Sequence, residues 1–228
     1  MIVRLHTTAS TMKDAAALAA KGEPHGTAVI ADIQTAGIGR QGHVWHSDDA
    51  GGLYISIVLR LPIPSGSMPI LTMALGLAVQ RAVNDLAQVS TDLRWPNDVM
   101  LSERKLAGIL VQAAEGALIA GIGLNVNQTA FPPDLAEIAT SLKIQTGIEH
   151  SKDALADRII AESLRYITLG KPEIRRRFEE SSTWPQGKAV EVDGRIRGVT
   201  AGLDENGFLL VRTPEKIETI IAGGVRPL

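Results

Sequence analysis

A glycine-rich segment places the strongest constraint on how this chain can fold. The run GIGRQG, residues 37–42, follows the apolar run TAVIADI, residues 27–33, which is typical of a buried strand. Glycines spaced as G-x-G-x-x-G after a strand occur in dinucleotide-binding folds, where a helix starts directly after them and points its N-terminus at the pyrophosphate. Either such a helix follows here, or the glycines serve a different kind of loop.

The residues after the glycines do not predict that helix. Residues 43–52, HVWHSDDAGG, are polar and rich in turn formers, and the next expected strand, LYISIVLRL at residues 53–61, has no acidic residue at its end to bind a ribose. We therefore favour a loop over a dinucleotide fold. Its backbone N–H groups can surround an anion, with Arg40 as the positive charge inside it. A surface loop without a ligand is the alternative.

The rest of the chain predicts an α+β domain followed by a small β-barrel-like domain. Helices are expected at residues 10–22, 69–88, 151–170 and 172–181, and a first strand is expected at residues 2–6. Residues 92–127 contain β-type runs separated by short turns, which indicates a hairpin or a meander. From Gly187 onward, short strands alternate with turns such as Asp193-Gly194 and Asn206-Gly207. The boundary between the domains is expected within residues 182–188.

Composition excludes several classes of function. The 228 residues contain no cysteine, which rules out disulfides, a cysteine nucleophile and cysteine-based zinc sites, and which fits a reducing cytoplasm. A formal net charge of −2 gives no indication of nucleic-acid binding. The longest apolar run, residues 68–79, is shorter than the ~20 residues that span a bilayer. We therefore expect a cytoplasmic protein that binds neither nucleic acid nor a membrane.

Two further segments place polar residues at the ends of expected strands. In RWPNDVMLSERKLAGIL, residues 94–110, a hairpin would bring Lys105 back beside Asn97 and Asp98. In GIGLNVN, residues 121–127, Asn125 follows two glycines. A solvated turn with a local Asx hydrogen bond explains either segment equally well, so the residues alone leave both interpretations open.

Together these segments resemble the motifs of a known family. Residues 31–47, 94–110 and 121–135 are similar, in order and spacing, to the three core motifs of biotin–protein ligases, and residues 10–12 fall at the family's first biotin-contact segment. The tail from Gly187 resembles the family's SH3-like C-terminal domain. The resemblance implies a class II synthetase-like domain over residues 1–184, with a mixed or antiparallel sheet and helices packed on one side, and an SH3-like β-barrel over residues 185–228.

The resemblance also implies a reaction. An enzyme of this family uses ATP to convert biotin to biotinyl-AMP and then transfers the biotinyl group to a lysine of a biotin carboxyl carrier protein. ATP, biotin and Mg²⁺ carried by the ATP phosphates are the implied ligands, and the enzyme is expected to be a monomer or a homodimer. Because the first strand is expected from Ile2, we expect a short form without the DNA-binding domain that some members carry. A lipoate–protein ligase or acyltransferase of the same superfamily, and a non-catalytic biotin or nucleotide sensor, are the alternatives.

The resemblance finally assigns residues of this chain to the site. Arg40 and Lys105 are the expected positive groups at the phosphates, and Asp98 is the candidate base for the acceptor amine. The expected biotin contacts are Ser10, Thr11, Met12, Gln34, Ile38, Gly39, Arg40 and Lys105, beside an apolar wall from residues 108–111 and 121–124. The expected contacts of ATP or the adenylate are Gly37, Arg40, Trp45, Asn97, Lys105 and Asn125. For Trp45, a place in the core is the alternative to stacking on adenine. The chain departs from the usual family residues at Met12, Ile38, His43 and Arg94.

Overall fold

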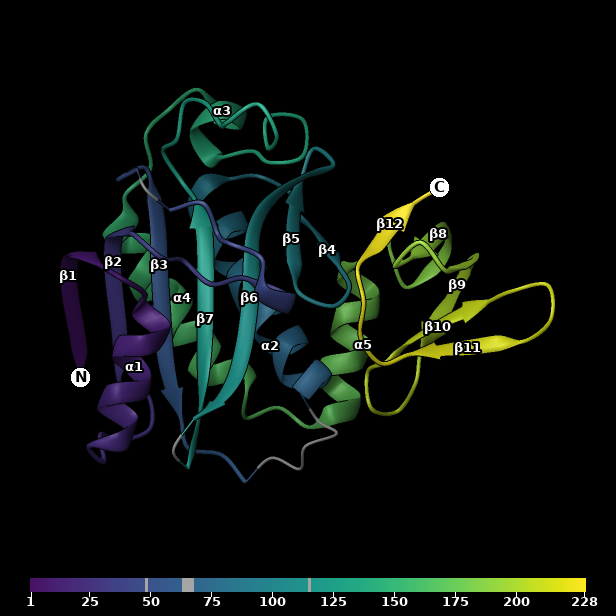
Figure 1. Cartoon of the computed structure of the whole chain (residues 1–228), viewed down its shortest axis with the longest axis horizontal. Coiled ribbons are helices and arrows are strands. Elements are labelled where there is room, and N and C mark those ends of the chain that lie inside the picture. Colours follow the sequence, from purple (N-terminus) through teal and green to yellow (C-terminus); the bar gives the residue numbers. More distant parts are fainter. Residues whose placement is uncertain (48, 63–67, 115) are drawn as a thin grey trace.

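The computed structural model describes residues 1–47, 49–62, 68–114 and 116–228, and within them a seven-stranded sheet forms the centre of the larger unit (Figure 1). In spatial order its strands are β1 (Ile2–Thr8), β2 (Ala28–Gln34), β3 (Gly52–Leu59), β7 (Ala117–Asn125), β6 (Arg104–Ala114), β5 (Asp98–Leu101) and β4 (Asp92–Arg94). Strands β1 and β2 pair in parallel, whereas the other neighbouring strands pair antiparallel. The predicted mixed sheet is therefore confirmed.

Five α-helices accompany the sheet in the described part of the chain. They are α1 (Thr11–Ala20), α2 (Met68–Ala87), α3 (Leu142–Thr146), α4 (Lys152–Tyr166) and α5 (Lys171–Ser181). Helices α1, α2, α4 and α5 confirm the four expected helices. The sequence did not predict α3, because five residues are too few to show a helical period of apolar residues. None of the described helices is long and apolar enough to cross a membrane.

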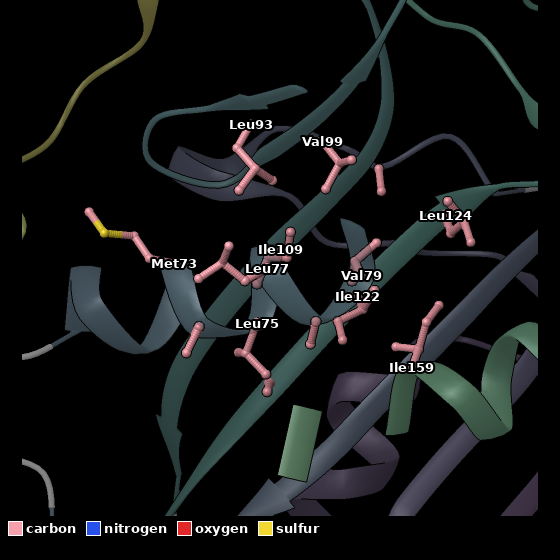
Figure 2. Packing of buried hydrophobic residues seen from close by; sticks show 14 of the residues in the cluster. Met73, Leu75, Leu77, Val79, Leu93, Val99, Ile109, Ile122, Leu124 and Ile159 are labelled. Atoms are coloured by element: carbon pink, nitrogen blue, oxygen red, sulfur yellow. The ribbon is translucent and has the colours of Figure 1, made fainter. Parts of the chain in front are cut away.

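The main hydrophobic core lies on one face of the sheet, under α2 and α4. Leu75 and Val79 from α2 belong to one buried cluster with Ile159 from α4 and with Ile109 and Ile122 from the sheet (Figure 2). Successive residues of a strand point to opposite faces, so every second residue of β3, β6 and β7 enters this core. Fully burying one such aliphatic side chain contributes roughly 1.5–3 kcal/mol, which makes this layer the main source of stability.

The expectation that the helices pack on one side of the sheet needs a correction for α1. Met12, Ala15 and Ala19 of this helix form a separate buried cluster with Val29 and Val58. These two valines alternate along their strands with residues of the main core, so their side chains point to the opposite face. The alanine-rich pattern of α1 predicts an apolar face but carries no information about which side of the sheet that face covers.

The C-terminal residues form a five-stranded antiparallel sheet at one end of the molecule, beside α5 (Figure 1). In spatial order its strands are β11 (Ile217–Ile220), β10 (Leu209–Arg212), β9 (Ile196–Leu203), β8 (Gln186–Val192) and β12 (Val225–Pro227). The predicted turns at Asp193-Gly194 and Asn206-Gly207 connect β8 to β9 and β9 to β10, and φ is positive at Asp193, Gly194 and Gly207. The antiparallel tail is thus confirmed, and the boundary after residue 184 stays a prediction.

A close contact joins the C-terminal sheet to the larger unit. Trp95 is buried directly after β4 and donates from its Nε1 to the carbonyl oxygen of Gly207 at 2.9 Å. Gly207 has a φ of +82°, and a Cβ at this position would lie 2.9 Å from Cδ1 of Ile70 and 3.0 Å from Cε of Met73. The turn therefore approaches α2 as closely as it does because it carries a glycine.

We expect Gly207→Ala to lower the free energy of unfolding by more than Gly22→Ala does. Both glycines have positive φ, +82° and +86°, so both substitutions carry the left-handed backbone penalty of roughly 1–2 kcal/mol. No described atom lies within 4 Å of a Cβ at Gly22, whereas Ile70 and Met73 must move at Gly207. Urea unfolding of the two variants measures the difference. Equal losses would show that the contact with α2 contributes no stability.

Candidate functional site

A pocket lies on the face of the sheet that carries α1, and glycines form its floor. Gly108 of β6 pairs with Gly123 of β7, and Gly121 lies two residues along the same strand. Because these residues have no side chains, they leave a flat strip of backbone. A Cβ at Gly123 would lie 2.5 Å from the Trp45 ring, and one at Gly121 would lie 2.7 Å from Sδ of Met12. The glycines thus make room for the side chains above them.

One end of the pocket is polar. The Oε1 atom of Gln34, at the end of β2, accepts from the backbone N of Thr11 at 2.9 Å and from Oγ1 of Thr11 at 3.1 Å. That hydroxyl lies 2.8 Å from Oγ of Ser56 on β3. Ser10 is also buried, and its Oγ has no hydrogen-bond partner in the described part of the chain. An unpaired buried hydroxyl is unfavourable, so a ligand that hydrogen-bonds Ser10 gains free energy here.

The glycine-rich segment folds into a small hairpin over the pocket. The backbone N of Gly39 donates to the His43 carbonyl at 2.7 Å, and that of Trp45 donates to the Gly37 carbonyl at 3.1 Å. A short 3₁₀ helix, Arg40–Gly42, forms the turn between them. No α-helix follows the glycines in this segment, so the predicted loop is confirmed and the dinucleotide fold is excluded.

The other end of the pocket is positively charged. Arg40 donates from Nη1 to Oδ1 of Asn97 at 3.0 Å. Nζ of Lys105 lies 2.6 Å from Oδ1 of Asp98 and 5.2 Å from the centre of the Trp45 ring. The hairpin between β5 and β6 brings Lys105 beside Asp98, as the sequence predicts. The two cations therefore reach the same region from different elements, which suits a site that holds an anion between them.

Two cationic side chains form ion pairs with Asp98. Its Oδ2 lies 2.7 Å from Nη2 of Arg94, and its Oδ1 faces Lys105. Burial by itself raises the pKa of the Asp98 carboxyl, but the charges and hydrogen bonds of Lys105 and Arg94 outweigh burial and hold that pKa below its ordinary value. A carboxylate with a lowered pKa is a weak base. The geometry therefore favours an orienting role for Asp98 over the expected role as base.

Arg40 is half-buried and interacts with the charges of two carboxylates. Burial lowers the pKa of its guanidinium, and the carboxylates of Asp98 and Asp193 oppose that effect. Arginine nevertheless stays protonated in proteins, so Arg40 brings a permanent charge. Asp193 belongs to the turn between β8 and β9, so the C-terminal sheet contributes to the electrostatic field at Arg40.

The structure brings most of the expected site residues together. Those that line the pocket are Ser10, Thr11, Met12, Gln34, Ile38, Gly39, Arg40, Trp45, Asn97 and Lys105. Gly37 does not line it and faces Ser47 instead, where a Cβ would lie 2.5 Å from Oγ. Tyr54 and Ile55 of β3 also line the pocket but were not predicted. Their apolar strand signal indicates burial and gives no indication of a ligand.

Asn125, like Gly37 and Asp98, is an expected site residue that does not line the pocket. Its Nδ2 donates to the carbonyl oxygen of Thr140 at 3.0 Å and lies 3.5 Å from that of Lys105. Asn125 thus ties residues 138–140, which also bond to the backbone of Lys105, to the end of β7. These carbonyl groups accept from the Nδ2 of Asn125 only, and the contact with adenine stays a prediction.

The pocket is almost filled by its own side chains. Its free volume is about 50 Å³, far below the ~300–1,000 Å³ of pockets that hold small molecules. Arg40 and Trp45 both come from the hairpin of residues 37–47, whereas the floor belongs to the sheet. A ligand can therefore enter when the hairpin moves. No three His, Cys, Asp or Glu side chains of the described residues are close enough together to hold a metal ion.

Comparison with known proteins decides the family. The model of the Biotin/lipoate A/B protein ligase family matches residues 5–128, and that of the Biotin protein ligase C terminal domain matches residues 187–225. The chain belongs to the biotin/lipoate A/B protein ligase family. The ligase is 36% identical to the Bifunctional ligase/repressor BirA of Bacillus subtilis, over 95% of this chain and 70% of that protein. It is 32% identical to the Biotin–[acetyl-CoA-carboxylase] ligase of Mycobacterium tuberculosis, over 96% of this chain and 85% of that protein.

A solved structure shows the same fold. The biotin protein ligase of Aquifex aeolicus, determined in complex with biotin and ATP, superposes on this ligase with a TM-score of 0.88 and 31% sequence identity, over 100% of this chain and 99% of that chain. The predicted resemblance to biotin–protein ligases, and the prediction that the chain is a ligase enzyme, are confirmed. The roles of the individual pocket residues remain predictions.

Proposed function

We propose that this ligase activates biotin with ATP to biotinyl-AMP and transfers the biotinyl group to a lysine of a biotin carboxyl carrier protein. The observation that carries the proposal is the layout of a single pocket. Hydrogen-bonding groups at Ser10, Thr11 and Gln34 lie at one end, Arg40 and Lys105 lie at the other, and a glycine floor connects them. A bicyclic ureido ring, an apolar chain and a terminal carboxylate match these three parts in order.

In the first step, a carboxylate oxygen of biotin attacks the α-phosphorus of ATP. The new P–O bond gives the mixed anhydride, and the bond to the β-phosphate oxygen breaks to release pyrophosphate. Two anions must approach each other, and negative charge grows on the leaving group. Arg40 provides planar, bidentate donors and Lys105 provides a mobile point charge, so both lower the barrier by opposing that charge.

In the second step, the neutral ε-amine of the carrier lysine attacks the anhydride carbonyl. An amide bond forms, the bond from the carbonyl carbon to the phosphate oxygen breaks, AMP leaves and the amine loses a proton. Asp98 is occupied by Arg94 and Lys105, so the phosphate of departing AMP, whose second pKa is about 6, is a better proton acceptor than this carboxylate. We propose that the hairpin of residues 37–47 closes over the anhydride in the interval, because the anhydride hydrolyses in water.

The proposed reaction also bears on the metal ion that accompanies ATP and on the compartment in which the ligase works. We infer that Mg²⁺ enters with ATP, held by the phosphates, since the described residues offer no cluster of acidic or histidine side chains for it. We place the reaction in the cytoplasm, where ATP is available and where a chain without cysteine needs no oxidising environment.

A comparison of biotin with lipoate tests the proposal. The purified ligase is incubated with ATP and Mg²⁺ and with either acid, while pyrophosphate release and labelling of a carrier domain are followed. We expect pyrophosphate and labelled carrier with biotin. Labelling with lipoate alone would identify a lipoate ligase, and binding of biotin without pyrophosphate release would identify a sensor. Either result would contradict the proposed function.

We expect Trp45→Ala to weaken the binding of ATP more than that of biotin. Stacking of a base on an aromatic ring contributes ~1–3 kcal/mol, and Trp45 is half-buried above Gly108 and Gly123 rather than deep in the main core. Calorimetry with each ligand measures both affinities. Gly123→Ala should have a similar effect, because its Cβ displaces the ring, whereas Gly121→Ala meets only the flexible end of Met12. Lower thermal stability with unchanged ATP affinity would favour a core role for Trp45.

A further inference from the structure

We infer that Arg94 and Trp184 are positioning residues for Lys105. In this arrangement Trp184 holds the guanidinium of Arg94 against Asp98. Arg94 compensates part of the negative charge of Asp98, so Lys105 keeps positive charge that attracts an anion. The inference rests on the proposed function, in which Lys105 faces the phosphates of ATP. It adds two residues that neither line the pocket nor belong to the expected site.

The carboxylate of Asp98 is shared between two cations. One oxygen lies 2.7 Å from Arg94 and the other lies 2.6 Å from Lys105, and the Asp98 side chain is only 12% exposed. Arg94 and Asp98 are also direct partners in the pairing of β4 with β5, so the backbone fixes their approach. A buried carboxylate needs opposite charge nearby, and both Arg94 and Lys105 provide it here.

Counting charges shows what Arg94 contributes. Arg94 and Lys105 carry two positive charges and Asp98 carries one negative charge, so the three side chains together keep one positive charge. Without Arg94, Lys105 and Asp98 neutralise each other, and the carboxylate, whose Oδ1 already lies 2.6 Å from Nζ of Lys105, attracts the ammonium group more strongly. Arg40, whose guanidinium also interacts with the charges of Asp98 and Asp193, then remains as the other cation that lines the pocket. Arg94 therefore raises the affinity of Lys105 for phosphate without touching it.

Trp184 holds Arg94 from the side of the C-terminal sheet. The guanidinium carbon of Arg94 lies 5.5 Å from the centre of the Trp184 ring, within the range of a cation–π interaction. Trp184 stands between the end of α5 and the start of β8, in a segment that is fastened to β4. The backbone N and the Oγ1 of Thr183 donate to the carboxylate of Asp92 at 2.9 and 2.6 Å, and Oγ of Ser182 donates to the Leu93 carbonyl.

The choice of arginine at position 94 fits this arrangement. A guanidinium is planar, so it can stack on an indole while one edge donates to a carboxylate, whereas an ammonium group makes a single point contact. The pair also connects the segment before β8 to Lys105 by direct contacts, through Trp184, Arg94 and Asp98 in turn. The connecting segment between the two sheets thus takes part in organising the site.

The titration of Asp98 tests the inference independently of catalysis. The pKa of its carboxyl is measured by carboxyl ¹³C NMR in the intact protein and in the variants Arg94→Gln, Arg94→Lys, Trp184→Leu and Trp184→Phe. Removing an opposite charge within ~4–6 Å is expected to raise that pKa by about 1–3 units in Arg94→Gln. Trp184→Leu should raise it by a smaller amount, while Arg94→Lys and Trp184→Phe should stay close to the parent.

The same variants are then assayed for biotin-dependent pyrophosphate release. We expect the KM for ATP to rise about tenfold or more in Arg94→Gln, because the contact of Lys105 with a phosphate is weakened, with partial rescue in Arg94→Lys and an unchanged KM for biotin. Arg212→Gln, an exposed charge on β10, is the matched control and should behave as the parent.

The outcomes separate this inference from the proposed function. An unshifted Asp98 pKa in both Arg94→Gln and Trp184→Leu overturns the inference whatever the activity is. Loss of kcat with an unchanged KM for ATP in both variants also overturns it, because that result indicates only general damage to the fold. A parent protein that releases no pyrophosphate contradicts the proposed function instead. The NMR titration still tests in that case whether Arg94 and Trp184 hold the pKa of Asp98 down.

Discussion

Lys105→Ala is expected to slow the formation of biotinyl-AMP by about 10²–10³, the usual cost of removing one group that stabilises the charge of a transition state. Lys105 is one of two cations that line the pocket at the end where Asn97 lies, and its Nζ is close to Asp98 and to the Trp45 ring. Arg40 stays in place in the variant, so some activity remains. The loss should appear mainly in kcat/KM for ATP.

The fold of the Lys105→Ala variant is expected to persist. The Lys105 side chain is 30% exposed, and Asp98 keeps its contact with Arg94. The pKa of the Asp98 carboxyl should rise toward its ordinary value. The ionised carboxylate stabilises the fold above the pKa that it has in the unfolded chain, and this stability is lost as the pH falls through the pKa that it has in the folded protein. In the variant the loss therefore occurs at a higher pH than in the parent. Single-turnover release of pyrophosphate and thermal unfolding measure the two effects. Lys143→Ala, which removes a half-buried lysine paired with the exposed Glu149, is the control. A folded Lys105→Ala variant with normal pyrophosphate release would show that Lys105 has no role in the first step.

Arg40→Gly is expected to release the biotinyl-adenylate rather than to abolish its formation. Arg40 belongs to the hairpin of residues 37–47, and its contact with Asn97 fastens that hairpin to the sheet, because the Asn97 amide in turn donates to the carbonyl of Ile109 at 3.0 Å. Glycine removes this clamp and adds conformational freedom to a turn that already contains glycines. Lys105 remains and still supports the first step.

Free biotinyl-adenylate should therefore accumulate and label lysines of unrelated proteins. Adenylate dissociation from the parent and from Arg40→Gly is measured by stopped-flow, and hydrogen exchange of residues 34–46 is measured with and without biotin and ATP. Arg40→Lys, which keeps the charge but not the bidentate geometry, should lie between the two. Equal dissociation rates, or a hairpin that is already protected without ligand, would show that the glycines form a static turn.

Much of the site can be predicted from the sequence because its parts lie in short contiguous motifs. Lys105 and Asp98 belong to one hairpin, so their spacing along the chain nearly determines their distance in space. Ser10 and Thr11 at the N-terminus of α1 and Gln34 at the end of β2 are brought together by a single parallel pairing of β1 with β2. The resemblance to a known family then supplies the chemistry that these residues share.

The features that were missed depend on contacts between distant parts of the chain. Trp184 lies 90 positions from Arg94 in sequence, and the hydrogen bonds of Ser182 and Thr183 to β4 hold the two in contact. Tyr54 lines the pocket with its ring over Gly52, where a Cβ would collide with Cζ of Tyr54. The bond from Nδ2 of Asn125 to the carbonyl oxygen of Thr140 could not be predicted either, since it forms only because residues 138–140 fold back onto the end of β7.

The central claim is that this pocket makes an acyl-adenylate from biotin. Biotin-dependent exchange of labelled pyrophosphate into ATP, in the absence of any carrier protein, tests it most directly because exchange requires reversible formation of the adenylate. We predict exchange that requires biotin, that lipoate does not support, and that falls by about 10²–10³ in Lys105→Ala. Bound biotin and ATP without exchange, or exchange with lipoate but not with biotin, would contradict the claim.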